Sequence, residues 1–105
     1  MKLLKVTNKV HEFYKANVRG NENITLDQLQ RKLTRNRELA MEVPPRNEAE
    51  RLIGNKLYLY GNLHFVVKNE TVVNIHNHSG GKFYGGWKLD VDKYNELTKQ
   101  LGIEQ

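Results

Sequence analysis

Between Leu57 and His78 the chain alternates apolar and polar positions with the period of a β-strand, and pairs of turn-forming residues interrupt the pattern twice. Gly61-Asn62 and Asn69-Glu70 suit tight two-residue turns. The pattern therefore predicts two successive hairpins, with strands over 56–60, 63–67 and 71–78.

The turn positions fix the expected pairing, in which Tyr58 faces Phe65, Val67 faces Val72 and Phe65 faces Asn74. Because side chains alternate along a strand, the sheet acquires two different faces. The first is aliphatic apart from one histidine and carries Leu57, Leu59, His64, Val66, Val73 and Ile75. The second is aromatic and turns polar at one end; it carries Tyr58, Tyr60, Leu63, Phe65, Val67, Val72, Asn74, His76 and His78.

Apolar residues at helical spacing surround these hairpins. The spacing predicts a helix over 2–16 and a second one that begins at the N-cap Thr25, runs through Met41 and is stopped by Pro44-Pro45. Two further capping patterns predict a short helical turn over 48–53 behind Asn47, and a final helix between Asp90 and Gly102.

These elements predict an α+β fold in one domain, residues 1–105: two N-terminal helices, a three- to four-stranded antiparallel β-meander and a C-terminal helix. The helices are expected to cover the aliphatic face and to leave the aromatic face partly open. The glycine-rich stretch 79–88 is either a loop or, around Gly85-Gly86, a fourth strand within 82–89.

Composition narrows the function classes. No apolar run approaches the ~20 residues that span a bilayer, and the N-terminus shows no signal peptide, so we expect a cytoplasmic protein without membrane contact. The absence of cysteine excludes disulfides and thiolate chemistry. The net charge is +5, and residues 1–56 hold 12 Lys and Arg against 7 Asp and Glu. This surplus indicates either a polyanionic partner or simply a soluble surface.

His76 and His78, two residues apart on one strand, are candidates for a catalytic acid–base pair, because histidine exchanges protons near neutral pH. A metal site would need a third ligand on the same face, and the expected register places His64 on the opposite face, so we predict no metal and no cofactor. The alternative is a pair of polar residues where a strand runs into solvent.

The aromatic face suggests nucleic acid, because exposed rings accept unpaired bases. The candidate RNA-binding residues on it are Tyr58, Tyr60, Phe65 and Asn74. Candidate phosphate-binding cations are Arg31 and Arg35 on the second helix and Lys82 in the glycine-rich stretch, with Arg37 placed to reach over the sheet edge as a catalytic cation. The alternatives are aromatic packing for the rings and a solvated helix face for the arginines.

Helices followed by strands that read Lys56-Leu57-Tyr58-Leu59-Tyr60, Leu63-His64-Phe65-Val66-Val67 and Thr71 to His78 resemble the small ribonuclease toxins related to barnase, colicin endonucleases and RelE-type messenger RNA interferases. The resemblance covers residues 25–80. It implies metal-independent RNA cleavage on an open sheet face. The arginine that often follows the last histidine in RelE-like proteins is missing here, where His76-Asn77-His78 stands instead.

Three functions follow as expectations. The first is a metal-independent endoribonuclease toxin that uses His76 and His78, with a neutralising protein as a further partner. The second is a non-catalytic nucleic-acid-binding regulator. The third is a phage or mobile-element protein-interaction module, in which the aromatic face is buried against a target protein or a second copy of the chain.

Overall fold

The computed structural model describes residues 1–45, 47–77 and 87–103. Its elements, in chain order, are β1 (Lys5–Val6), α1 (Asn8–Asn17), α2 (Leu26–Leu39), β2 (Met41–Val43), α3 (Glu48–Ile53), β3 (Lys56–Tyr60), β4 (Leu63–Lys68), β5 (Thr71–Asn77) and α4 (Val91–Gln100). The strands form one five-stranded sheet in the order β1-β5-β4-β3-β2. All neighbouring strands are antiparallel except β1 and β5, which are parallel. The predicted α+β class is confirmed.

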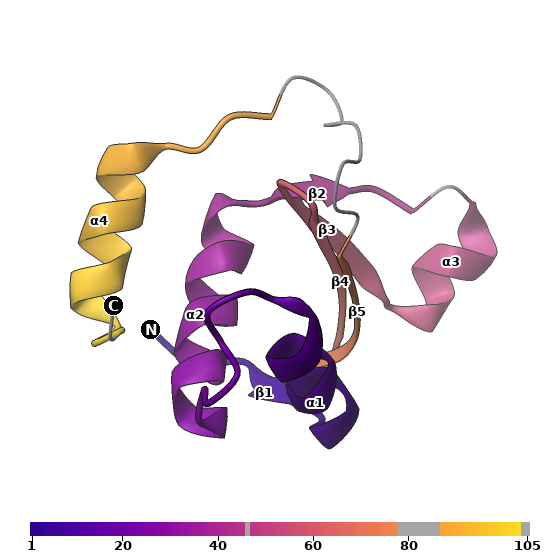
Figure 1. Cartoon of the computed structure of the whole chain (residues 1–105). Coiled ribbons are helices and arrows are strands. Elements are labelled where there is room, and N and C mark those ends of the chain that lie inside the picture. Colours follow the sequence, from indigo (N-terminus) through magenta and orange to yellow (C-terminus); the bar gives the residue numbers. More distant parts are fainter. Residues whose placement is uncertain (46, 78–86, 104–105) are drawn as a thin grey trace.

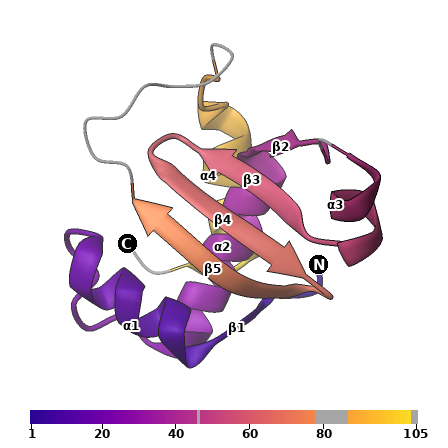
Figure 2. The same ribbon diagram turned by 90° about the vertical axis from the view of Figure 1, so that its right-hand side faces the viewer.

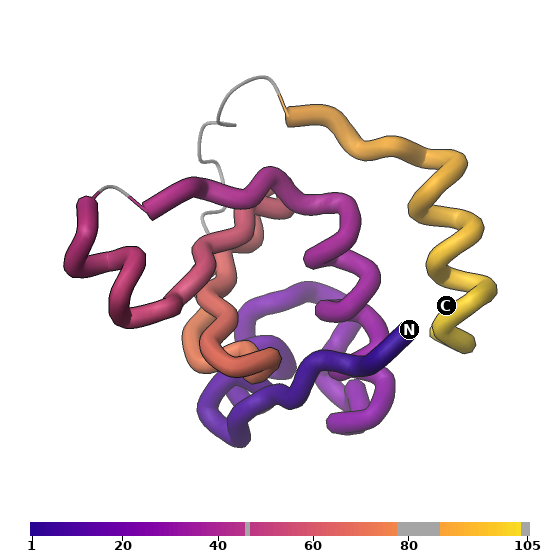
Figure 3. The backbone as a smooth tube through the Cα atoms, turned by 180° about the vertical axis from the view of Figure 1, so that it is seen from behind, coloured from indigo at the N-terminus to yellow at the C-terminus, as the bar shows by residue number. Residues whose placement is uncertain are grey.

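The helices divide unequally between the two sides of the sheet. In Figure 1 the sheet is seen nearly edge-on, with α2 and α4 on one side and α3 on the other. Figure 2 looks onto the side that carries no long helix, and α2 and α4 lie behind the strands. The view from behind in Figure 3 shows α2 between α4 and the strands.

Local sequence signals placed most element ends correctly. The predicted caps are present: the side chains of Thr25, Asn47 and Asp90 each accept a hydrogen bond from the backbone N–H three residues later. Gly54 ends α3 in the left-handed conformation, as a C-terminal glycine does. Both predicted hairpin turns occur, and Asn69 and Glu70 take positive φ angles of 51° and 60°.

The N-terminal residues form a strand, and the prediction of one helix over 2–16 is wrong at its start. Thr7 is the N-cap of α1, and its side chain accepts a hydrogen bond from the Val10 N–H. The preceding residues extend beside β5, where Lys5 N–H donates to the Glu70 carbonyl at 2.9 Å. Leu4 is fully buried, and its N–H donates to the Thr34 hydroxyl at 2.9 Å. The apolar residues of this segment fit helical spacing in the sequence, but in the structure they alternate as the residues of a strand do.

A second strand was also missed. The second helix was expected to run through Met41, but it ends at Leu39, and Met41–Val43 pair with β3 as the edge strand β2. The predicted antiparallel meander of three to four strands is therefore part of a larger mixed sheet. Trp87 to Asp90 are not in a strand, and the rest of the possible fourth strand lies outside the described residues.

The prediction that the aromatic face stays open is wrong. Phe65 is fully buried and stacks on Tyr58, with ring centroids 5.5 Å apart. These rings belong to the main core, with buried side chains of the N-terminal segment before α1 and of α1, α2, β4 and β5: Leu4, Val6, Val10, Tyr14, Leu29, Leu33, Val67, Val72 and Ile75. The aromatic face offers the larger apolar area, so covering it with helices removes more apolar surface from water.

A bulge in β5 changes which residues share a face. Pairing begins as predicted, with Val67 opposite Val72, but Val66 lies opposite Asn74, so Val73 is an extra residue. Beyond this point each residue of β5 is shifted by one position relative to the expected register. Ile75 enters the core opposite Phe65, and His76 lies opposite His64. The prediction that Asn74 and His76 share a face with the aromatic rings is therefore wrong.

Candidate functional site

The side of the sheet away from α2 and α4 is the candidate site, and we call it the open face. Alternation along β3, β4 and β5, corrected for the bulge, assigns to it Leu57, Leu59, His64, Val66, Lys68, Asn74 and His76. Most of these side chains are partly or fully accessible, whereas Leu59 is buried. The sequence placed most of this aliphatic set correctly on one face and assigned that face to the core.

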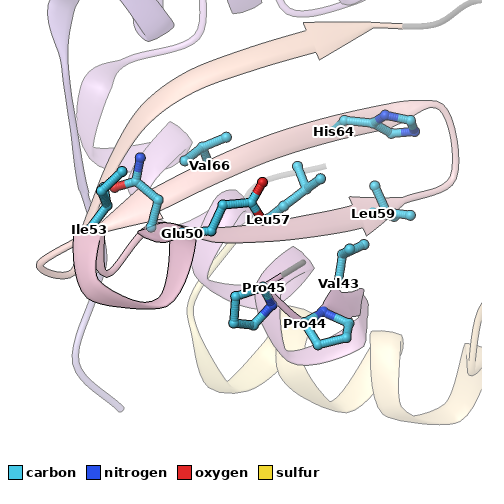
Figure 4. A pocket seen from close by; sticks show the side chains of 10 residues that line it. Val43, Pro44, Pro45, Glu50, Ile53, Leu57, Leu59, His64 and Val66 are labelled. Atoms are coloured by element: carbon cyan, nitrogen blue, oxygen red, sulfur yellow. The ribbon is translucent and has the colours of Figure 1, made fainter. Parts of the chain in front are cut away.

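A groove of about 490 Å³ lies on the open face, and Figure 4 shows the side chains around it. Its floor comes from β3 and β4, and its wall comes from the end of β2, the β2–α3 connection and α3. The lining residues are Val43, Pro44, Pro45, Glu50, Ile53, Asn55, Leu57, Leu59, His64 and Val66. Apolar side chains predominate, and the polar residues of the lining are Glu50 on α3, Asn55 between α3 and β3, and His64 on β4.

Helix α3 extends the apolar surface beyond the groove. None of its residues is buried, and Leu52 and Ile53 are exposed to 77% and 55%. The helix is held by its Asn47 cap and by an ion pair between Glu48 and Arg51. Exposed leucine and isoleucine next to an apolar groove form a continuous patch of the kind that marks an interaction site.

Two histidines face each other across β4 and β5 on this side of the sheet. His64 and His76 are direct register partners, and residues paired in this way have Cβ atoms about 4.5–5.5 Å apart. Asn74, two residues earlier on β5, places its side-chain nitrogen 3.4 Å from Nε2 of His76. The predicted pair was His76 and His78, and His78 lies outside the described residues. The prediction that His64 lies on the opposite face from His76 is wrong, because the bulge brings the two together.

The three aromatic residues proposed to stack on bases lie on the covered side. Phe65 is fully buried and Tyr58 is 8% exposed. Tyr60 is partly buried and meets Trp87 edge-on, with ring centroids 5.3 Å apart. Burial raises the pKa of Tyr58, and a hydrogen bond with the Glu42 carboxylate raises it further. Burial also raises the pKa of Tyr60. Phe65 and Tyr58 therefore belong to the core, and Tyr60 packs at its margin.

The prediction that Arg35 decorates a solvated helix face is also wrong, because α4 packs against α2 and encloses it. Arg35 is 6% exposed, and its guanidinium donates to Asn36 Oδ1 at 3.1 Å and to Thr98 Oγ1 at 3.2 Å. It also lies over the Tyr94 ring, 4.2 Å from the centroid. This arrangement of hydrogen bonds and cation–π contact fixes α4 to α2.

The other two candidate arginines, Arg31 and Arg37, are paired with other groups at the surface. Arg31 donates to the Asp27 carboxylate at 2.9 Å and to the Leu101 carbonyl at 2.6 Å. Arg37 reaches the sheet, as expected, but pairs with Glu70 in the β4–β5 turn at 2.9 Å. The hydrogen bond from Arg37 lowers the pKa of the Glu70 carboxyl below its usual value. Neither arginine joins the histidine pair, and Lys82 lies outside the described residues.

Two features are absent from the described residues. No group of three or more His, Cys, Asp or Glu side chains gathers within metal-binding reach there. None of the helices in the part of the chain that the structure describes has the length and apolar character needed to cross a membrane.

Sequence reasoning missed the groove because its wall comes from residues read only as helix stops and caps. Pro44 and Pro45 follow β2 and line the groove. Ile53, at the end of α3, also lines it. One signal was available: α3 places apolar Leu52 and Ile53 side by side in a helix of six residues that is too short to bury both.

The fold defines the chain as a small α+β protein with an uncovered, mainly apolar groove, and sequence comparison assigns it to a family. Residues 4–100 match the YorE family, so the chain belongs to that family. It is 37% identical, over 106 aligned positions, to the SPbeta prophage-derived uncharacterized protein YorE of Bacillus subtilis (strain 168), covering 99% of this chain and 85% of that protein. No solved structure is significantly similar to this chain.

Proposed function

We propose that the chain is a protein-interaction module that binds an apolar segment of another protein in the groove of its open face. The observation that carries the proposal is the uncovered groove of about 490 Å³, lined mainly by apolar side chains. The relative is named as prophage-derived, and the proposal takes this chain to be a phage or mobile-element protein as well.

The shape of the apolar surface favours a polypeptide over a small molecule. The groove volume alone would suit either kind of ligand. However, α3 also exposes Leu52, which does not line the groove and which a small ligand in the groove would leave in water. A protein segment covers both the groove and the neighbouring helix, as the apolar centre of an interface does.

Charge on the open face indicates the flanks of that segment. In the described residues, the strands β3 to β5 present one lysine, Lys68, and two histidines on this face and no carboxylate, while α3 brings Glu50 to the wall of the groove. The chain as a whole carries a net charge of +5. We therefore expect a target segment with apolar anchors next to aspartate or glutamate, because opposite charges steer association and fix orientation.

Selection from a peptide-display library tests this expectation. Peptides that bind the immobilised chain should share apolar residues flanked by carboxylates, and Leu52→Asp and Leu57→Gln should each weaken their binding at least tenfold. Val91→Asp, at an exposed apolar position on α4, is the matched control and should bind as the unchanged chain does. Circular dichroism checks folding in each variant. Selected peptides that bind all four proteins equally would overturn the proposal.

RNA cleavage is a second candidate function, and the pairing of His64 with His76 supports it. Two imidazoles on an accessible face are suited to remove a proton from a ribose 2′-hydroxyl and to protonate the departing 5′-oxygen. This version replaces the predicted partner His78 with His64. It lacks an assigned cation for the phosphorane, because Arg37 is paired with Glu70.

Labelled RNA at low salt distinguishes the two candidates. The ribonuclease hypothesis expects cleavage that resists EDTA and is lost in His64→Ala and His76→Ala. A regulator that only binds RNA would leave the RNA intact, and its affinity would fall steeply with salt. If the chain neither cleaves RNA nor binds it in a salt-dependent way, the protein-interaction proposal is the one that remains.

A further inference from the structure

The bulge in β5 creates a pair of metal-ligating side chains that the unbroken register would have separated. If β5 paired with β4 without the bulge, Val73 would lie opposite Val66, and His76 would lie opposite Leu63 on the covered side while His64 stayed on the open face. With it, the two histidines are direct partners on adjacent strands and share the open face. His64 is partly accessible and His76 is exposed, so an ion from solution can reach both rings.

We propose that His64 and His76 form a binding site for a divalent transition-metal ion that prefers imidazole nitrogen, of which Cu²⁺ binds most tightly. Two imidazoles that ligate one ion at adjacent positions hold their nitrogens ~3 Å apart, given metal–nitrogen bonds of ~2.1 Å. Paired residues with Cβ atoms about 4.5–5.5 Å apart can meet this requirement by rotating their rings toward each other. Among divalent ions, the order of affinity for such ligands peaks at Cu²⁺.

The surroundings define what kind of site this is. No third His, Cys, Asp or Glu completes the set among the described residues, so the ion keeps open positions for water. Both histidines already take part in other contacts, and binding replaces some of them. The contact between Asn74 and Nε2 of His76 is long at 3.4 Å, so its loss costs little. The proposal rests on neither candidate function, because it concerns metal binding alone.

Titration of the purified chain with Cu²⁺ in a buffer that does not chelate metals tests the site, with calorimetry as the readout. His64→Asn and His76→Asn should each weaken binding at least tenfold. His11→Asn is the matched control: its ring contacts the Ile24 carbonyl, away from the open face, and we expect no change. Acidification from about pH 7.5 to about pH 5.5 should release the ion, since protons compete for imidazole nitrogen.

Electron paramagnetic resonance of the Cu²⁺-loaded chain gives a second readout that does not depend on the stability of any variant. Two imidazole nitrogens should couple to the copper in the unchanged chain, and one should remain in His76→Asn, whose replaced side chain is exposed. Binding retained in both histidine variants, or coupling to a single imidazole in the unchanged chain, would overturn the proposal.

Discussion

The covered and open faces of the sheet come from the same strands but differ in how their apolar side chains are used. On the covered side, Phe65 and its neighbours are enclosed by α1 and α2, and α4 packs on α2 through Arg35. On the open face, Leu57 and Val66 remain partly accessible beside α3, which buries none of its residues. Apolar character alone therefore did not indicate which face is the core; the relative size of the two surfaces did.

Truncation of neighbouring residues on β4 should show this difference most strongly. Phe65→Ala removes a fully buried ring and should lower the free energy of unfolding by about 3–5 kcal/mol. Val66→Ala, one position later on the open face, should cost about 1 kcal/mol or less. Urea denaturation measures both. Equal losses of unfolding free energy would mean that the open face is buried in solution, and would contradict the difference between the two faces.

The pH dependence of stability reports how tightly the covered side excludes water. Burial raises the pKa of Tyr14 from 10.0 to about 12, so the folded chain holds this proton more tightly than the unfolded chain. The associated stability is complete below about pH 10 and is lost as the pH rises toward 12. At 1.36 kcal/mol per pKa unit, the loss is about 3 kcal/mol.

Tyr14→Phe should remove this contribution to the loss of stability at alkaline pH, because phenylalanine has no ionisable proton. Urea denaturation of both proteins at several pH values between about 8 and 12 measures the difference. Parallel loss of stability in the two proteins would show that Tyr14 is not the titrating group.

The attachment of α4 to α2 can be tested at Arg35. Arg35→Ala removes two side-chain hydrogen bonds and the contact with the Tyr94 ring, and should lower the free energy of unfolding by about 2 kcal/mol. Arg51→Ala on α3 is the control, since that arginine is exposed and its ion pair with Glu48 should contribute less than about 1 kcal/mol. Thermal unfolding followed by circular dichroism distinguishes them.

The smallest effect on stability is expected at the rim of the open face. Leu52→Gln should change the free energy of unfolding by less than about 0.5 kcal/mol, because that side chain is 77% exposed. The same change should reduce the binding of an apolar fluorescent dye. Val91→Gln on α4 should leave dye binding unchanged, and a loss of similar size in both variants would argue against a specific apolar patch at α3.

The sequence was most informative where a local signal acts alone. Thr25, Asn47 and Asp90 cap their helices as predicted, and the two-residue turns set the pairing of Tyr58 with Phe65. It was least informative where distant parts of the chain decide. Nothing local shows that Leu4 and Val6 alternate into the core or that α4 encloses Arg35. The prediction of the candidate site was the least accurate, because it depended on which side of the sheet the helices cover.

The extra residue in β5 has a consequence for how proteins of this kind can diverge. A deletion of one codon at Val73 would remove the bulge but keep the other pairs of β4 and β5, with Asn74 still opposite Val66 and His76 still opposite His64. The imidazole of His76 would stay on the open face, and Ile75 would stay opposite Phe65 in the core. Loss of this one residue is therefore a change in chain length that the strand can absorb without exchanging the two faces of the sheet.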